Sequence, residues 1–448
     1  MGVLDIILFP LYVLLFHLFF AYRRKKLKDP VLRFYHKWGF WLKIFSTFAI
    51  TVFNYYISIG DSTTLYYPEG MNLFRLILQD SSNLQWLFME GKDFSKDLVG
   101  NSANTGYFKS EANFFIIRLV AIFAFFTFGR YLLINLFFSM IAFTGIWKLF
   151  RFFYNRYPHL HKRIAVAVLF LPTVVFWSSG ALKDPVCMGM LGWMTYCIYE
   201  GFYKKRNALL NGLIAMLSIW ILSIVKNYII FAYLPFFVLY LFLININLIK
   251  GTFVKLIVVV VISGISIGGF VLVSDKLREE MGGLALGNLN ESVASQQANF
   301  IDMADKAESS FSLGVEYDGS IGGLAKLAPA AINATLFRPY LWESKKISTL
   351  LSSIESLSLM LFTLYVLYKA GLWLFFSTVI KDPMVMFCFF FSLLFALFIG
   401  ATTLNFGTLV RYKIPCMPFY IMALVLINEH SVTAKKNASS KKEANAVV

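Results

Sequence analysis

Two aspartates, far apart in the sequence, are the first candidates for chemistry. Asp61 opens the polar and aromatic segment 60–70 directly after an apolar run, and Asp184 lies in the short segment 176–185 between two apolar runs. A carboxylate in such a place can accept a proton from a sugar hydroxyl or bind a divalent cation. The alternative for Asp61 is that it caps the next short helix, because Asp is a favoured N-cap residue.

The tripeptide Lys-Asp-Pro occurs three times, at 28–30, 183–185 and 381–383. Asp before Pro predicts the start of a helix, with Asp as the cap and Pro in the first turn, where no backbone N–H is needed. The first and third copies fall on the cytoplasmic side of the topology predicted below. Asp184 is therefore set apart by its side of the membrane, and with Asp61 at the same depth it could form one site.

Basic residues near these carboxylates are candidates to hold a phosphate. An Arg can bind phosphate through two parallel hydrogen bonds, and a Lys acts as a point charge. The alternative for each is anchoring at the membrane interface, since long basic side chains reach toward it. The candidates are Lys183, Lys226, Arg338 and Arg411.

The composition indicates a membrane protein. Of the 448 residues, 58% are hydrophobic, 48 are Phe and only 15% are charged, against about 25% charged in soluble domains. These values exclude a soluble globular enzyme, a disordered chain and a coiled coil, and the four Cys exclude a disulfide scaffold. The net charge of +16 is interpreted as topology and lipid contact, because no basic patch is interleaved with base-stacking aromatics. We expect no nucleic-acid partner.

The apolar runs predict an all-α, polytopic membrane helix bundle of about eleven spans, with a range of 10 to 12. Basic clusters at 23–37, 151–163, 204–206 and 435–442 are all cytoplasmic if 113–150 crosses once, so 113–128 is predicted to be an interfacial or half-inserted helix. The predicted spans are 3–22, 39–59, 131–150, 164–180, 185–203, 208–225, 228–247, 252–273, 347–368, 384–404 and 413–429.

This topology predicts a single transmembrane domain over 1–429, with long outer loops at 60–112 and 274–346. The first span is expected to stay as an anchor, because no cleavable signal peptide precedes it. The segment 430–448 is predicted to be a basic cytoplasmic tail, and the composition of its last 15 or so residues favours disorder.

The layout resembles the GT-C superfamily of integral-membrane glycosyltransferases, the group of protein O-mannosyltransferases and lipid A aminoarabinose transferases. The first outer loop of that family is similar to Asp61 followed by Tyr66, Tyr67 and Glu69. A later outer turn with Pro, Ser, Asp and Tyr is similar to Pro172, Ser178, Ser179, Asp184 and Tyr196, and a last outer motif is similar to Arg411, Tyr412, Pro415 and Pro418. The chain has a weaker resemblance to the polymerases of exopolysaccharide and O-antigen assembly.

The resemblance implies an enzyme that transfers a sugar from a polyprenyl-phosphate carrier to a glycan, lipid or protein acceptor on the outer face. It implies a multi-pass protein of the bacterial inner membrane with a cytoplasmic C-terminus. Asp61 is then the general base or orients the acceptor, and Asp184 positions the acceptor or shares a cation with Asp61. Arg411, with Lys183 or Lys226, holds the departing phosphate. The further substrate-binding candidates are Tyr66, Tyr67, Glu69 and Arg338. No cofactor is certain, and a divalent cation, Mg²⁺ or Mn²⁺, is a candidate.

Three alternatives stay open. A polysaccharide polymerase would use the same lipid-linked substrates but would place its site in 274–346, where Arg338 would matter more than Asp61. A transporter would have broken helices near the membrane midplane. A non-catalytic membrane subunit would tolerate the loss of both aspartates.

Overall fold

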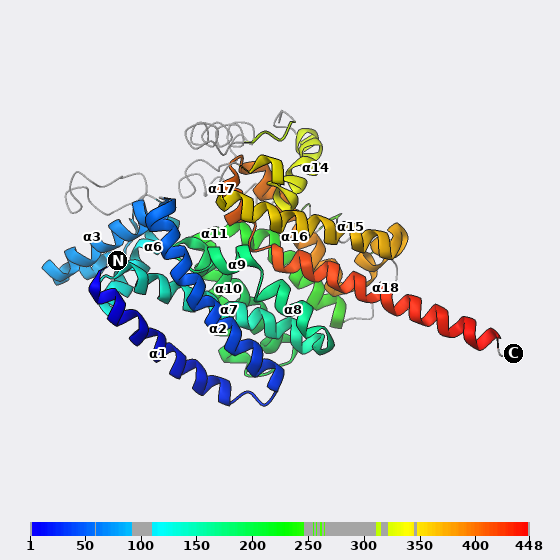
Figure 1. Ribbon diagram of the computed structural model, residues 1–448, viewed down its shortest axis with the longest axis horizontal. Coiled ribbons are helices and arrows are strands. Elements are labelled where there is room, and N and C mark those ends of the chain that lie inside the picture. Colours follow the sequence, from blue (N-terminus) through cyan, green and yellow to red (C-terminus); the bar gives the residue numbers. More distant parts are fainter. Residues whose placement is uncertain are drawn as a thin grey trace. The chain divides into compact units, whose positions relative to one another are not determined.

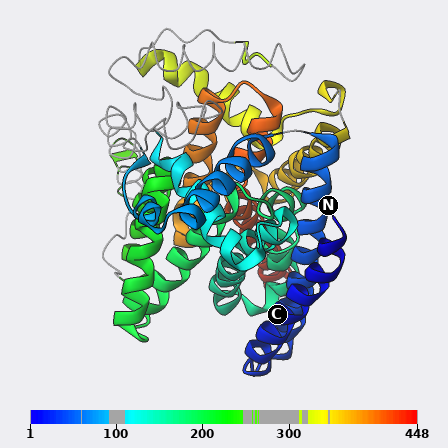
Figure 2. The ribbon, with the colours of Figure 1, turned by 90° about the vertical axis from the view of Figure 1, so that its left-hand side faces the viewer.

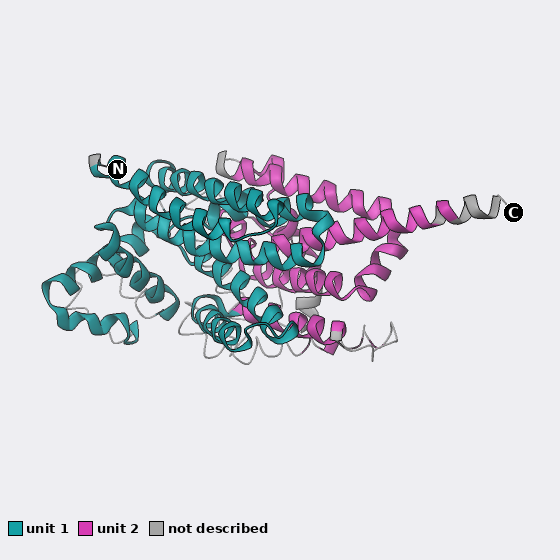
Figure 3. Cartoon of the chain, turned by 90° about the horizontal axis from the view of Figure 1, so that it is seen from below, with its two compact units in different colours: residues 1–227, 276–283 teal, residues 228–275, 284–448 magenta. Residues whose placement is uncertain are grey.

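The computed structural model describes residues 2–58, 60–91, 110–245, 311–314, 321–344 and 347–446, together with 254, 257, 260–261 and 264. Every regular element in these residues is a helix. The chain divides into two compact units (Figure 3). Unit 1 comprises Met1–Asn227 and Lys276–Gly283, and unit 2 comprises Tyr228–Asp275 and Leu284–Val448.

Unit 1 carries the following elements in chain order: α1 (Val3–Lys25), α2 (Pro30–Val52), π-helical turns at Phe53–Ile57 and Ser62–Tyr66, α3 (Tyr67–Gln79), a 3-10 helix at Ser81–Leu87, α6 (Glu111–Thr127), α7 (Tyr131–Arg156), a 3-10 turn at Pro158–Leu160, α8 (His161–Val168), α9 (Pro172–Trp177), α10 (Lys183–Ile198), a π-helical turn at Tyr199–Tyr203, and the first part of α11 (Ala208–Asn245). Unit 2 carries the rest of α11, then α14 (Ile321–Phe337), a 3-10 turn at Leu341–Glu343, α15 (Ile347–Lys381), α16 (Pro383–Thr402), α17 (Phe406–Tyr412) and α18 (Met417–Ala446).

Five of these helices are long and apolar enough to cross a membrane, and up to seven spans result if each of two bent helix pairs counts as one. The bends are 83° between Pro30–Ile57 and Ser62–Gln79, and 64° between Phe406–Tyr412 and Met417–Asn437. The chain is thus an all-helical protein with several candidate membrane spans. The number eleven stays a prediction, and most of the predicted span 252–273 lies outside the described residues. The helix α6 is not among the candidate spans.

The helices α7 and α10 form the most extensive helix packing in unit 1 (Figure 1). Their backbones meet at glycines, since a Cβ added to Gly145 would lie 1.9 Å from the carbonyl oxygen of Gly189. The two helices run parallel, because Asn135 contacts Ala181 at one end and Trp193 contacts Thr144 further along. The segment that connects the end of α7 to the start of α10 must therefore run back along this helix pair.

That return lies where the sequence predicted one span, 164–180. The structure corrects the continuous helix to two short ones, α8 and α9, with a break at 169–171. The physical reason is Pro172, which has no N–H to continue an α-helix and instead takes the first turn of α9.

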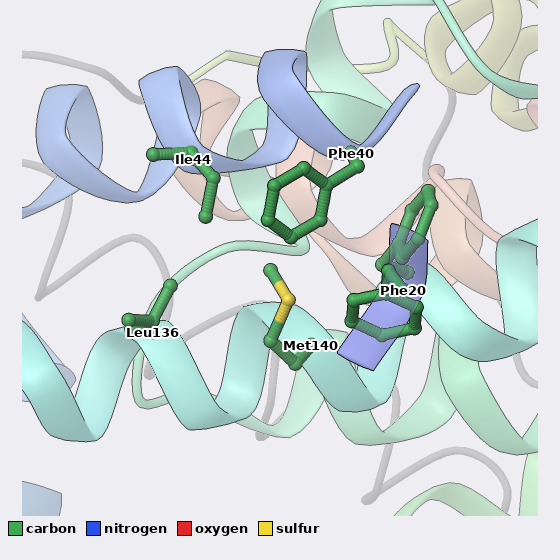
Figure 4. Packing of buried hydrophobic residues seen from close by; sticks show 6 residues of the cluster. Phe20, Phe40, Ile44, Leu136 and Met140 are labelled. Carbon is green, nitrogen blue, oxygen red and sulfur yellow. The ribbon is translucent and has the colours of Figure 1, made fainter. Parts of the chain in front are cut away.

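An aromatic cluster packs α1 and α2 against α7. Figure 4 shows Phe40 and Ile44 of α2 facing Leu136 and Met140 of α7, with Phe20 of α1 beside them. All of these side chains are buried. In the turned view of Figure 2, α1 (dark blue) again runs beside α2. This cluster fixes the helix that carries Lys43 against the helix that carries the site residues described below.

The long helices α11 and α15 are each interrupted at one residue. In α11, 38 residues long, Lys226 has the extended dihedrals φ −155° and ψ 76°. This break coincides with the predicted boundary between spans 208–225 and 228–247. In α15 the break is at Gly371, whose φ of 72° suits glycine.

The predicted disordered tail is also corrected. The helix α18 continues through Ala446, across most of 430–448. Ala, Lys and Glu are strong helix formers, and a helix that has already begun extends at low cost.

Candidate functional site

The first turn of α7 holds the two segments that carry the predicted aspartates. The hydroxyl of Tyr131 lies 2.8 Å from Ser62 Oγ, next to Asp61. One turn later, Asn135 Oδ1 accepts a hydrogen bond of 2.8 Å from the backbone N–H of Ala181, just before Lys183. Because Tyr131 and Asn135 lie one turn apart at the start of α7, this helix brings the Asp61 segment and the start of α10 to the same end of unit 1.

A buried lysine of α2 fixes the turn that precedes α10. Lys43 Nζ donates to Val175 O at 3.1 Å, Ser178 O at 2.7 Å, Ser178 Oγ at 2.5 Å and Ser179 Oγ at 2.9 Å. The carbonyls at the end of a helix have no partner within it, so the ammonium satisfies the last turn of α9. All four of these acceptors are neutral.

The carboxylate of Asp184 forms a buried ion pair with Lys226. The distance from Lys226 Nζ to Asp184 Oδ1 is 2.6 Å, and the side chains are 5% and 1% exposed. A buried charge requires such a partner, because its transfer out of water is costly. The ion pair joins the start of α10 to the break in α11.

The prediction that Asp184 caps a helix is wrong. The N-cap of α10 is Leu182, and Asp184 lies inside the first turn. Its two counterparts behave as predicted: Asp29 accepts from Val31 N in α2, and Asp382 accepts from Met384 N and Val385 N in α16. At 183–185 the helix begins before the aspartate instead of after it. The Asp184 carboxylate therefore pairs with the ammonium of Lys226, which is a stronger partner than a backbone N–H.

Lys183 connects the ion pair to Asp61. Its ammonium is partly buried and interacts electrostatically with Asp61, Asp184 and Lys226. Asp61 is exposed, and although it is the N-cap of the turn Ser62–Tyr66, its side chain makes no capping hydrogen bond. The capping alternative for Asp61 is therefore not supported. Two cations and two carboxylates form this group, which we call the Asp61 cluster (Asp61, Lys183, Asp184 and Lys226), and only Asp61 of its members is exposed.

The aromatic and acidic residues after Asp61 lie in the packing of α3. Tyr66 donates to Asn113 Oδ1 at 3.1 Å, and Tyr67 donates to Gly129 O at 2.9 Å. Glu69 is buried and accepts from Asn72 Nδ2 at 3.2 Å. Tyr67 also packs edge-on against the ring of Tyr131, with 5.0 Å between ring centres. These residues support the cluster and orient the segment that carries Asp61.

The other two predicted phosphate ligands, Arg338 and Arg411, belong to unit 2. Arg338 Nε donates to both carboxylate oxygens of Glu343, at 2.9 and 3.1 Å, and its Nη1 donates to Ser312 O at 3.0 Å. Arg411 lies in the last turn of α17. The structure thus ties Arg338 into the packing of unit 2.

In unit 2, another buried lysine, Lys413, holds the backbone at Arg338. Lys413 Nζ donates to Arg338 O at 3.2 Å and to Ser356 Oγ at 3.0 Å. It also interacts electrostatically with Glu355. This arrangement resembles that of Lys43, because an ammonium again satisfies the carbonyl that follows a helix.

A divalent metal does not fit the described residues. They contain no group of three or more His, Cys, Asp or Glu that could hold a metal ion. In addition, one oxygen of Asp184 is engaged by Lys226. We therefore derive no step through Mg²⁺ or Mn²⁺.

The sequence did not single out Lys43, Tyr131 or Asn135. Lys43 had a usable signal, because it lies inside the predicted span 39–59, where an ionisable residue is expensive and usually functional or structural. Tyr131 and Asn135 had none, since polar residues at the start of a span are common. Comparison of the chain with protein-family models, curated proteins and solved structures finds no match.

Proposed function

We propose that the chain is a membrane transferase that moves a sugar from a polyprenyl-phosphate carrier to an acceptor hydroxyl at the outer face. One observation carries the proposal: an exposed carboxylate, Asp61, interacts with Lys183, whose own charge lies beside a buried and balanced ion pair. A base that substrate can reach, next to a cation, suits a reaction in which a hydroxyl loses a proton and a phosphate departs.

In the proposed reaction, the acceptor oxygen attacks the anomeric carbon of the donor sugar, and its proton passes to Asp61. The bond from that carbon to the carrier phosphate breaks, and its electron pair leaves with the phosphate oxygen. Lys183, whose ammonium interacts electrostatically with Asp61, stabilises the negative charge that develops there. The products are the glycosylated acceptor, the carrier phosphate and a protonated Asp61, which then returns its proton to water.

Asp184 and Lys226 are positioning residues in this scheme. Both are almost fully buried, so neither is placed to touch substrate directly. Their pairing fixes the first turn of α10 and hence the position of Lys183. Lys226, the cation of the pair, also interacts electrostatically with Lys183.

A second candidate function is transport of a lipid-linked sugar. It is favoured by the break in α11 at Lys226, because transporters place ionisable residues at interrupted helices. No comparable observation supports the polymerase, because the Arg338 side chain is already bound to Glu343 and Ser312.

The experiment that tests the proposal is Asp61→Asn in the producing cell. Lipid-linked sugars and envelope glycans are profiled by mass spectrometry at equal protein level. We expect one glycan to be lost, with transfer slowed about 10²- to 10⁴-fold, while its carrier-bound precursor accumulates. The matched control is Asp80→Asn, because Asp80 is an exposed aspartate of the same unit that caps Ser81–Leu87.

The location of the precursor separates the two candidates. In spheroplasts of the Asp61→Asn strain, a membrane-impermeant periodate reagent should oxidise the accumulated sugar if transfer at the outer face is blocked. A precursor protected from the reagent would instead support transport. Unchanged glycans in a strain with normal protein would refute the transferase.

A further inference from the structure

At the far end of the α7 and α10 pair, two basic side chains share one aromatic surface. Lys148 and Arg151 are three residues apart and so lie on one face of α7. Lys148 Nζ lies 4.4 Å from the ring centre of Trp193 and 4.2 Å from that of Tyr196. The guanidinium carbon of Arg151 lies 5.2 Å from the ring centre of Tyr196. Cation–π contacts of this kind hold both charges in place.

The aromatic surface is itself rigid. Trp193 donates its ring N–H to Thr144 Oγ1 at 3.0 Å, and Tyr196 is buried. Gly145 and Gly192 bring the two backbones into direct contact beside it. The position of both cations is therefore fixed by the helix pair before any ligand binds.

Among the described residues, one donor of this pair has no acceptor. Arg151 Nε is buried without a hydrogen-bond partner among the described residues. A buried polar group of this kind destabilises the protein when it is unpaired. Within the described part of the chain, the recorded contacts of Lys148 Nζ are the two aromatic faces. A bound anion could accept a hydrogen bond from Arg151 Nε and neutralise the ammonium of Lys148.

The local charge balance also favours an anion. Lys148 interacts electrostatically with Arg23, Arg151 and one carboxylate, Glu200. That carboxylate is already engaged by Lys204 at 3.3 Å and by Arg206 at 3.7 Å. The charges recorded near Lys148 among the described residues are therefore mostly positive.

We infer that Lys148 and Arg151, with Trp193 and Tyr196, form a binding site for a phosphate group. An Arg fork and an ammonium are the donors that suit a phosphate. The predicted topology places this end of α7 on the cytoplasmic side, where the headgroups of anionic lipids supply such a group. Free phosphate has the same chemistry. The inference does not depend on the transferase proposal, since Asp61 lies at the opposite end of the helix pair.

The test uses the full chain, purified in an uncharged detergent and stripped of lipid. Thermal unfolding is followed with added phosphatidylglycerol, with phosphatidylcholine of the same chains, and with inorganic phosphate. We expect phosphatidylglycerol to raise Tm by several degrees, and phosphatidylcholine not to. If phosphate alone gives the shift and competes with the lipid, free phosphate is the ligand; if phosphate has no effect, the lipid headgroup is. No shift with either, or equal shifts with both lipids, overturns the inference.

A double variant and its control locate the effect. In Lys148→Gln/Arg151→Gln the phosphatidylglycerol concentration for half of the shift should rise at least tenfold. The control is Lys162→Gln/Lys205→Gln, which removes two exposed charges from the same unit and should bind like the wild type. Equal loss in both variants would show general charge attraction and would overturn the site.

A measurement on the wild-type protein covers the case in which the double variant does not fold. An amine-reactive reagent is applied with and without phosphatidylglycerol, and modified peptides are counted by mass spectrometry. The lipid should protect Lys148 and leave Lys162 reactive. Equal modification of Lys148 in both samples contradicts the inference.

Discussion

The same tripeptide, Lys-Asp-Pro, performs two different tasks in this chain. At 28–30 and 381–383 the aspartate caps a helix through neutral backbone N–H groups, and Asp382 in addition lies 2.9 Å from His430 Nε2 at the exposed end of its helix. At 183–185 the aspartate lies inside the helix and is buried against Lys226. Since the local sequence is the same, the difference comes from what surrounds the copy at 183–185. A cation from a distant helix takes the place of the backbone as the partner of the carboxylate.

The largest effect should come from breaking that ion pair. Lys226→Met leaves the Asp184 carboxylate buried without its cation, so we expect a loss of about 3–5 kcal/mol in unfolding free energy. Asp29→Ala removes only a cap and should cost about 1 kcal/mol. Thermal unfolding in detergent measures both variants.

The double variant Asp184→Leu/Lys226→Met sharpens the comparison. Removing both charges avoids a buried charge without its partner. Proteins in which a buried ion pair is replaced by apolar residues often keep their stability. We expect Tm to recover toward that of the wild type. If Lys226→Met alone unfolds at the same temperature as Asp29→Ala, the ion pair at 183–185 stabilises the protein no more than a cap does, and the comparison fails.

A smaller loss is expected at Lys43, the other buried lysine near this turn. All four of its acceptors are carbonyl or hydroxyl oxygens. Lys43→Met therefore leaves neutral groups unpaired rather than a charge, and we expect a cost of about 1–3 kcal/mol. The same unfolding measurement ranks it between Lys226→Met and Asp29→Ala. A loss larger than that of Lys226→Met would mean that the turn at Ser178, and not the ion pair, fixes the start of α10.

How much of this site the sequence could predict depends on how far apart in the sequence the interacting residues lie. Apolar run lengths located the long helices, and the polar pair Lys226-Asn227 marked the break in α11. Pro172 marked the break between α8 and α9, but the run of apolar residues around it concealed the signal. The two aspartates could be placed at one depth because topology depends on charge and length alone.

The partners of those aspartates were beyond such reasoning. Lys43 binds carbonyls whose positions exist only once α9 has packed against α2. Tyr131 and Asn135 act through a tertiary contact of one helical turn with two separate segments. A position in the sequence specifies which groups are available, while the folded helices decide which of them meet.

The smallest effect concerns the first tripeptide, which lies outside the membrane spans and can be followed by pH. The hydroxyl of Tyr154 donates to Asp29 Oδ2 at 2.6 Å, and this hydrogen bond lowers the pKa of Asp29 below its usual value of 3.8. A carboxyl with a lowered pKa in the folded state stabilises the protein above pH 3.8, and that contribution is lost as the pH falls through the lower folded value. The variant Tyr154→Phe should therefore have a slightly lower Tm than the wild type at pH 7. The gap should narrow below about pH 4, since protonated Asp29 no longer gains from the hydroxyl. A gap that stays constant from pH 7 to pH 3 would mean that Tyr154 acts through packing alone, and that Asp29 depends only on its backbone cap.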